Sequence, residues 1–277
     1  MSEQTDNKKT VIYRTADGKD LFFTFLPPAK KLYDKAPVYF MIPGGGWHVA
    51  DQIGMFNFMH ASAKKLSENG FFVASISYRL ADDGYRIDEI IGDCFYGLKY
   101  LCDNADTFGV DIKKIYVTGH SAGGHLALML SYASAGDFDV DIEDDYKIVG
   151  VAALSPLTVL YDYECKYPNL VGFDTGYLFE DSGADSPERR KSSPIDCVGA
   201  NTPPTMLFAG TDDTLVYCYS SVVLYEKLKQ YGLPAELVLS ENGGHCFEEM
   251  KEGVKVSVTF YQVQIMTADF GIKLCNS

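Results

Sequence analysis

The chain has 277 residues, a length that suits one large α/β domain or two smaller domains. Hydrophobic residues make up 47% of it and charged residues 22%, which is typical of globular proteins and excludes disordered and collagen-like classes. Its formal net charge of −14 at pH 7 argues against nucleic acid and anionic membrane surfaces as partners, because both carry charge of the same sign.

The lack of targeting signals in this sequence and its cysteine usage both lead us to expect a cytoplasmic protein. No apolar run approaches the roughly 18 residues of a membrane-spanning helix, and the opening MSEQTDNKKT lacks the apolar core of a secretion signal. The seven cysteines are scattered, odd in number and without a C-x-x-C pair. This pattern indicates reduced thiols rather than a disulfide framework or a zinc site.

Strand-like and helix-like runs alternate along most of the chain. The turn sequence DGKD inside residues 10–28 predicts an N-terminal antiparallel hairpin. Further strands are expected at 37–42, 71–77, 114–119, 147–155, 204–210 and 235–240. Helices are expected at 56–69, 88–104, 122–135, 219–232 and 248–270, the last of them rich in β-branched residues.

This alternation predicts an α/β fold with a mostly parallel central sheet, helices on both faces and the antiparallel hairpin at one side. The strands are apolar at successive positions, as expected where helices cover both faces. We expect residues 1–277 to form a single domain. Residues 158–193 break the rhythm with tyrosine, glycine and acidic residues, and we interpret them as an irregular insertion over the sheet, whose aromatic side chains shape the pocket.

A candidate nucleophile lies between the strand expected at 114–119 and the helix expected at 122–135. Residues 119–123, GHSAG, match G-x-S-x-G, a turn so tight that side chains at its glycines would collide with neighbouring backbone. The position lifts the hydroxyl of Ser121 above the sheet and directs a helix N-terminus at the reacting carbonyl.

A serine nucleophile needs a base and a carboxylate that orients the base. Of the five histidines, His245 lies in a glycine-flanked loop after the last expected strand, whereas the others precede or adjoin Ser121. The sequence GTDDTLV offers two carboxylates at the end of an earlier strand, Asp212 and Asp213. A serine, aspartate, histidine order along the chain is that of α/β-hydrolases.

Backbone donors for a tetrahedral oxyanion are expected in PGGGW, directly after the strand at 37–42. Gly44, Gly45 and Gly46 allow the backbone to approach a substrate without an intervening Cβ.

Five segments together resemble the α/β-hydrolase esterases of the hormone-sensitive-lipase-like and acetyl or feruloyl esterase (BD-FAE-like) group. They are PVYFMIPGGGW, SYRLAD, FGVDIKKIYVTGHSAGGHLAL, GTDDTLV and GGHCF, and the likeness covers about residues 36–250. The resemblance implies that Ser121 is the nucleophile, Asp213 the acid and His245 the base. The choice of Asp213 follows the family pattern G-x-x-D-x-x-V, read here as Gly210, Asp213 and Val216.

The same resemblance assigns the oxyanion donors to the backbone of Gly45, Gly46 and Ala122. One departure concerns Pro43, because the family usually has a histidine before the glycines, whose side chain braces the loop. The residues expected to line or support the substrate pocket are Trp47 and His120.

We therefore expect a serine esterase that forms an acyl-enzyme, needs no cofactor or metal, and acts on small esters with short acyl groups, such as acetyl esters of sugars. The acidic run 137–145 lacks the glycine and glutamate of a calcium-binding EF-hand loop. Two alternatives stay open: an arylformamidase that uses the same machinery, and a non-catalytic binding protein on this scaffold. A homodimer is also left open.

Overall fold

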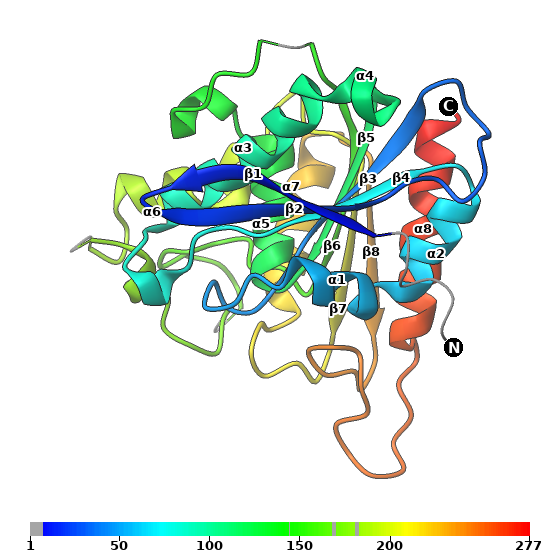
Figure 1. Ribbon diagram of the computed structural model, residues 1–277. Helices are drawn as coiled ribbons and strands as arrows, with labels where there is room; N and C mark the ends of the chain where they lie inside the picture. Colours follow the sequence, from blue (N-terminus) through cyan, green and yellow to red (C-terminus); the bar gives the residue numbers. More distant parts are fainter. Residues whose placement is uncertain (1–7, 144, 168–169, 181–182) are drawn as a thin grey trace.

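The computed structural model describes residues 8–143, 145–167, 170–180 and 183–277, in which eight strands form one sheet (Figure 1). The sheet order is β1-β2-β4-β3-β5-β6-β7-β8. The strands are β1 (Lys9–Ala16), β2 (Lys19–Leu26), β3 (Ala36–Ile42), β4 (Phe72–Ile76), β5 (Val110–His120), β6 (Ile148–Leu154), β7 (Thr205–Gly210) and β8 (Ala235–Ser240). The β1–β2 and β2–β4 pairs are antiparallel and the others parallel, which confirms the predicted fold class.

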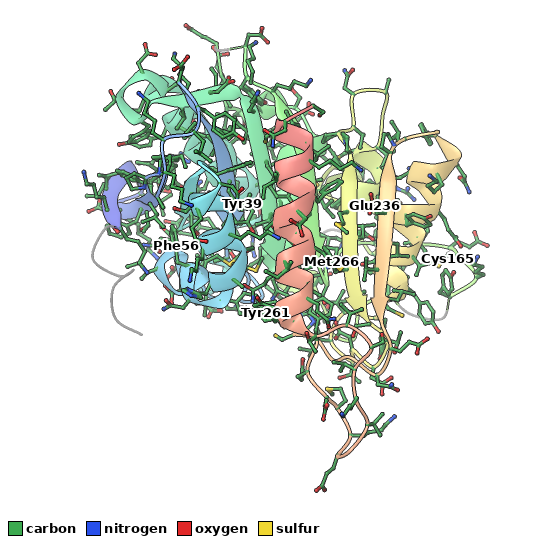
Figure 2. The ribbon with its side chains drawn as sticks, turned by 90° about the vertical axis from the view of Figure 1, so that its right-hand side faces the viewer. Tyr39, Phe56, Cys165, Glu236, Tyr261 and Met266 are labelled. Atoms are coloured by element: carbon green, nitrogen blue, oxygen red, sulfur yellow. The ribbon has the colours of Figure 1, made fainter. Side chains whose placement is uncertain are left out.

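Helices cover both faces of the sheet. The α-helices are α1 (Gln52–Phe58), α2 (His60–Glu68), α3 (Ile87–Asp103), α4 (Ala105–Phe108), α5 (Ala122–Tyr132), α6 (Pro187–Lys191), α7 (Tyr219–Gln230) and α8 (Phe260–Cys275). Short 3-10 helices are η1 (Ala81–Asp83), η2 (Ala135–Phe138), η3 (Gly176–Leu178) and η4 (Pro194–Cys197). Side chains of α1, α2 and α8 pack on one face of the sheet, which faces the viewer in Figure 2, and those of α3, α5 and α7 pack on the other face. Within the described ranges, no helix is both long and apolar enough to cross a membrane.

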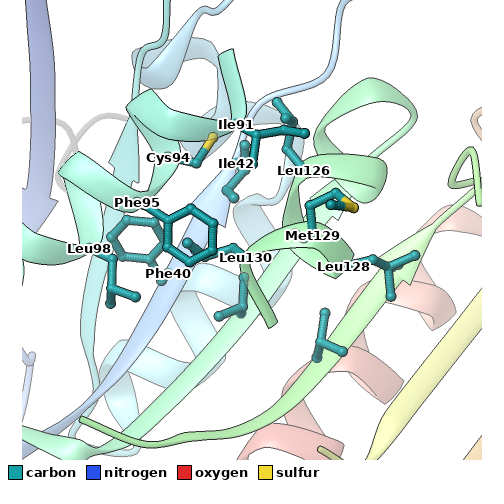
Figure 3. Close-up of a cluster of buried hydrophobic side chains, with 14 of the residues drawn as sticks. Phe40, Ile42, Ile91, Cys94, Phe95, Leu98, Leu126, Leu128, Met129 and Leu130 are labelled. Carbon is teal, nitrogen blue, oxygen red and sulfur yellow. The ribbon is translucent and has the colours of Figure 1, made fainter. Parts of the chain in front are cut away.

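The core lies in two layers because alternate residues of a strand point to opposite faces. Val38, Phe40 and Ile42 of β3 belong to the cluster under α3 and α5, whereas Tyr39 and Met41 belong to the cluster under α2 and α8. Figure 3 shows the first cluster, where side chains of α3 and α5 meet those of the sheet. All five residues are fully buried, and this two-sided burial holds the carboxyl ends of the central strands in fixed positions.

The prediction of a helix over 248–270 is wrong in its first half, because the helix begins only at Phe260. The preceding residues form a loop that projects from the body beyond the strand ends (orange in Figure 1). This loop contains Gly253, with a φ of +78°, and several valines, which favour extended backbone. The side chain of Thr259 accepts a hydrogen bond from the backbone N–H of Gln262, a cap that starts α8.

Smaller differences concern element ends. The helix expected at 56–69 is two helices, α1 and α2, separated at Met59. Strand β5 begins at Val110, four residues before the expected start, and α5 ends at Tyr132. These boundaries depend on packing and capping, which hydrophobic periodicity does not report.

The segment 158–193, here called the insertion, lies between β6 and β7 and contains η3 and α6. Four of its residues, 168–169 and 181–182, lie outside the described residues. The backbone N–H of Gly172 donates to the carbonyl of Leu215 at 2.7 Å, so the insertion contacts the loop that follows β7.

Candidate active site

Ser121 occupies a strained turn between β5 and α5. Its backbone φ of 56° and ψ of −124° form a combination that residues other than glycine rarely adopt. A Cβ on Gly119 would lie 2.0 Å from the carbonyl oxygen of Gly123, and one on Gly123 would lie 2.2 Å from that of Ile42. Both glycines are therefore required by close backbone packing. The Ser121 N–H donates to the carbonyl of Leu154 at 2.8 Å, which ties the turn to β6.

His245 and Asp213, residues 32 positions apart, meet beyond the ends of β7 and β8. The Nδ1 of His245 lies 2.7 Å from Oδ2 of Asp213. The other oxygen of this buried carboxylate accepts backbone N–H groups from Leu215 and Val216, at 2.9 and 3.0 Å. These two bonds fix the carboxylate, so it orients the imidazole and leaves Nε2 as the nitrogen able to take a proton.

The neighbouring Asp212 lies elsewhere. Its Oδ2 forms an ion pair with Lys251 at 3.0 Å, and its backbone N–H donates to Gly243. Of the two carboxylates in GTDDTLV, the structure thus brings only Asp213 to His245.

The structure brings His245 beside the end of β5. The rings of His120 and His245 lie 4.7 Å apart between centroids, and His120 immediately precedes Ser121. Among the residues that the structure describes, the Ser121 hydroxyl has no hydrogen-bond partner. The hydrogen bond between Ser121 and His245 therefore stays a prediction; such catalytic contacts are often long before substrate binds.

Two side chains hold the main chain of His245. The Nε2 of His120 donates to the His245 carbonyl oxygen at 2.9 Å, and the hydroxyl of Ser155 donates to the same atom at 3.0 Å. Burial, and secondarily the nearby His245, lowers the pKa of His120 to about 4, so this ring is neutral near pH 7. Sequence reasoning expected His120 near the site but missed Ser155, whose one available signal was its place directly after β6.

The glycine loop after β3, residues 44–46, has backbone conformations and close contacts that require glycine. Gly45 and Gly46 have φ values of +121° and +62°, and a Cβ on Gly44 would lie 2.5 Å from the carbonyl oxygen of His120. In the described part of the chain, the backbone N–H groups of Gly45, Gly46 and Ala122 donate to no protein acceptor. These are the three donors expected from the resemblance.

The two residues expected to line or support the pocket lie in different surroundings. Trp47 is fully buried, its ring nearly perpendicular to that of His125 at 5.4 Å between centroids, and it is not part of the lining of the cavity beside the glycine loop. His120 borders a cavity of about 310 Å³. The lining of this cavity consists of Pro43, Gly44, Gly45, Asp51, Gly54, Met55, Phe58, His120 and Cys246.

A larger cavity of about 510 Å³ lies within the insertion. Tyrosines, carboxylates and Arg189 line it. Ser121 and His245 line neither this cavity nor the one of about 310 Å³, which His120 borders. Among the described residues, no group of three histidine, cysteine, aspartate or glutamate side chains is gathered closely enough to hold a metal ion.

Comparison with known proteins gives concordant matches. A model of the BD-FAE family matches residues 24–228. The isoprenylcysteine alpha-carbonyl methylesterase ICME of Arabidopsis thaliana is 28% identical over 218 residues, which cover 76% of this chain and 50% of that protein. The chain spans about half the length of the first curated relatives it matches.

Solved structures show the same fold. Esterase 2 of Thermogutta terrifontis phosphonylated by sarin superposes with a TM-score of 0.79 at 22% identity, covering 98% of this chain and 96% of that one. The butyrate-bound form of the same esterase gives a TM-score of 0.77 at 22% identity, covering 97% and 94%. These similarities show the α/β-hydrolase fold.

Proposed function

The chain belongs to the BD-FAE family, and on that basis we propose that it is a serine esterase that hydrolyses short-chain acyl esters. The observation that carries the proposal is the 2.7 Å contact between His245 and the buried Asp213, next to a serine in a strained turn. Two backbone donors hold one oxygen of this buried carboxylate and leave the other directed at the imidazole, as the acid of a catalytic triad requires.

The proposed reaction begins when Nε2 of His245 removes the proton of Ser121 as its Oγ attacks the ester carbonyl. Asp213 stabilises the resulting imidazolium, and the N–H groups of Gly45, Gly46 and Ala122 bind the oxyanion. His245 then protonates the leaving alcohol, and an acyl-enzyme forms. Water attacks the acyl carbonyl while His245 takes its proton, and the carboxylic acid leaves as the Ser121 hydroxyl is restored. Each oxyanion donor in such a site is worth about 3 kcal/mol of transition-state stabilisation.

The size of the cavity beside the glycine loop supports a small acyl group. Its volume of about 310 Å³ is at the lower end of the range for small-molecule pockets, and Met55 and Phe58 form part of its wall. The related Thermogutta terrifontis esterase has been solved with butyrate bound, which agrees with a short chain. For the alcohol we propose a hydroxyl-rich group such as a sugar, because tyrosines and carboxylates line the cavity of the insertion.

The test of the nucleophile is labelling with a fluorophosphonate probe. We expect the native protein to be labelled and Ser121→Ala to stay unlabelled, since only an activated serine reacts. A neighbour in structure, esterase 2 of Thermogutta terrifontis, has been solved phosphonylated by sarin, an organophosphorus reagent of the same kind. Absence of labelling in the native protein, with its fold intact by circular dichroism, would instead support a binding protein.

The substrate class is tested with p-nitrophenyl esters of increasing acyl length, together with N-formylkynurenine and acetylated sugars. We expect the highest kcat/KM for two- to four-carbon acyl groups and turnover of acetylated sugars. Turnover confined to N-formylkynurenine would favour an arylformamidase.

A further inference from the structure

The glycine loop lacks the histidine that usually precedes it in the family, yet its carbonyl groups are held by other partners. The hydroxyl of Tyr78 donates to the Pro43 carbonyl at 2.8 Å. The Gly45 carbonyl accepts the backbone N–H groups of His48 and Val49, at 3.0 and 3.2 Å. The third partner comes from the insertion, since the hydroxyl of Tyr177 donates to the Gly46 carbonyl at 2.8 Å, 131 residues away in the chain.

Holding these carbonyls also sets the directions of the N–H groups. In a trans peptide the N–H points opposite to the preceding C=O, so the bonds on the Gly45 carbonyl direct the Gly46 N–H the other way. The bond from Tyr177 fixes the next peptide, Gly46–Trp47, and so holds Gly46 from its other side. The Gly46–Trp47 peptide lies between two left-handed residues, with φ values of 62° at both Gly46 and Trp47. For Trp47 this conformation costs on the order of 1 kcal/mol or more, and it persists only where surrounding contacts enforce it.

Tyr177 is itself fixed by its neighbours. Its ring stacks on His48 with 4.7 Å between centroids and an interplanar angle of 30°, and Nδ1 of His48 lies 2.6 Å from Asp82. The guanidinium of Arg86 donates to the Tyr177 carbonyl at 3.1 Å. Burial, with a smaller effect of the carboxylates of Asp82 and Asp174, raises the pKa of Tyr177 to about 12, so its hydroxyl stays a proton donor at every pH relevant to turnover.

We propose that Tyr177 is a positioning residue that holds the Gly46–Trp47 peptide so that the loop N–H groups face the oxyanion, in place of the bracing histidine that Pro43 replaces. This inference rests on the esterase function proposed above. It gives the insertion a role in the reaction itself: the segment between β6 and β7 completes the loop that follows β3.

The test is Tyr177→Phe, which removes one hydroxyl and keeps the ring that stacks on His48. Loss of a single neutral hydrogen bond predicts a five- to tenfold fall in kcat for p-nitrophenyl acetate, with KM within about twofold. The loss falls on kcat because the oxyanion exists only in the transition state. A trifluoromethyl ketone, which forms a tetrahedral adduct with the serine, should lose affinity by the same factor.

The matched control is Tyr225→Phe on α7, which also removes the hydroxyl of a partly buried tyrosine. That hydroxyl has no hydrogen-bond partner among the described residues, so we expect unchanged kcat, KM and inhibitor affinity. Thermal unfolding should be similar for both variants and the native protein.

The possible outcomes separate this inference from the proposed function. An active native protein with Tyr177→Phe unchanged in kcat and inhibitor affinity overturns the inference alone. A lower melting temperature with unchanged kcat also overturns it, because it shows a purely structural contact. A native protein that neither hydrolyses esters nor reacts with a fluorophosphonate contradicts the proposed function itself.

Discussion

The imidazole of His120 donates to the main-chain carbonyl of His245 at 2.9 Å, so the contact joins the side chain of one histidine to the backbone of the other. His120 uses its side chain to hold the backbone of His245, whose own side chain contacts Asp213. One histidine thus positions and the other is available for proton transfer. This division explains why two imidazoles with centroids only 4.7 Å apart do not compete for one role.

The two adjacent carboxylates after β7 should respond differently to the same substitution. Asp213→Asn removes the charge that orients and stabilises the imidazolium, and we expect kcat to fall by about 10⁴-fold with little change in fold. Asp212→Asn removes only a surface ion pair with Lys251 and should leave kcat within about twofold. Steady-state kinetics of both variants on p-nitrophenyl acetate make the comparison. Equal losses would show that the assignment of the acid is wrong.

Ser155→Ala removes one of the two donors to the His245 carbonyl and leaves His120 as the other. Because the imidazole is then less firmly placed, we expect kcat to fall about five- to tenfold, as for the loss of one hydrogen bond. Ser75→Ala is the control, since that hydroxyl is buried without a partner in the described residues and its loss should not affect kcat. A Ser155→Ala variant as active as Ser75→Ala would contradict the role of this contact.

Gly123→Ala would force a Cβ to within 2.2 Å of the Ile42 carbonyl oxygen, a backbone atom that cannot move aside cheaply. We expect a loss of several kcal/mol in the free energy of unfolding, together with loss of turnover, because the turn that carries Ser121 is displaced. Gly199→Ala meets nothing within 4 Å and should change stability by less than about 0.5 kcal/mol. Urea unfolding of the two variants measures the difference.

Met55→Ala enlarges the cavity of about 310 Å³ beside Gly44, Gly45 and His120. If acyl chains enter there, the ratio of kcat/KM for hexanoate to that for acetate should rise by about tenfold, since each methylene in an apolar pocket is worth 1 to 3 kcal/mol. Met266→Ala removes the same volume from α8, away from this cavity, and should leave the ratio unchanged. An unchanged ratio in Met55→Ala would exclude this cavity as the acyl site.

Stability should fall with pH between about 6.5 and 4. Burial lowers the pKa of both His120 and His125 from 6.5 to about 4, so in this window the unfolded chain binds more protons than the folded one. The contribution is complete above pH 6.5 and is lost as pH falls toward 4, at most about 3 kcal/mol for each residue.

Urea unfolding at several pH values tests this dependence. The slope of the unfolding free energy against pH reports how many more protons the unfolded chain binds than the folded one. This number should approach two in the native protein and one in His125→Asn. The variant His60→Asn, which alters an exposed side chain, should keep the native slope. Identical slopes in all three proteins would mean that the buried histidines do not govern acid unfolding.

Much of the fold was predictable because it follows from local pattern. Alternating apolar strands and amphipathic helices indicate a two-sided parallel sheet, and the tight turn at Ser121 is recognisable from its flanking glycines. The helix expected at 248–270 shows the limit of that reasoning. Apolar content continued through the projecting loop, but the cap at Thr259, not the hydrophobic pattern, decides where α8 begins.

By itself, the sequence determined the order of strands and helices along the chain and the residue types able to act as nucleophile, acid and base, because spacing and composition are local properties. The family pattern already favoured Asp213 over Asp212, but only the tertiary structure showed its contact with His245. Only the tertiary structure decided that Ser155 holds the same histidine and that Tyr177 reaches the glycine loop. These contacts join residues 32, 90 and 131 positions apart. They depend on which strand ends lie side by side and on how the loops cross them, and no local pattern specifies either.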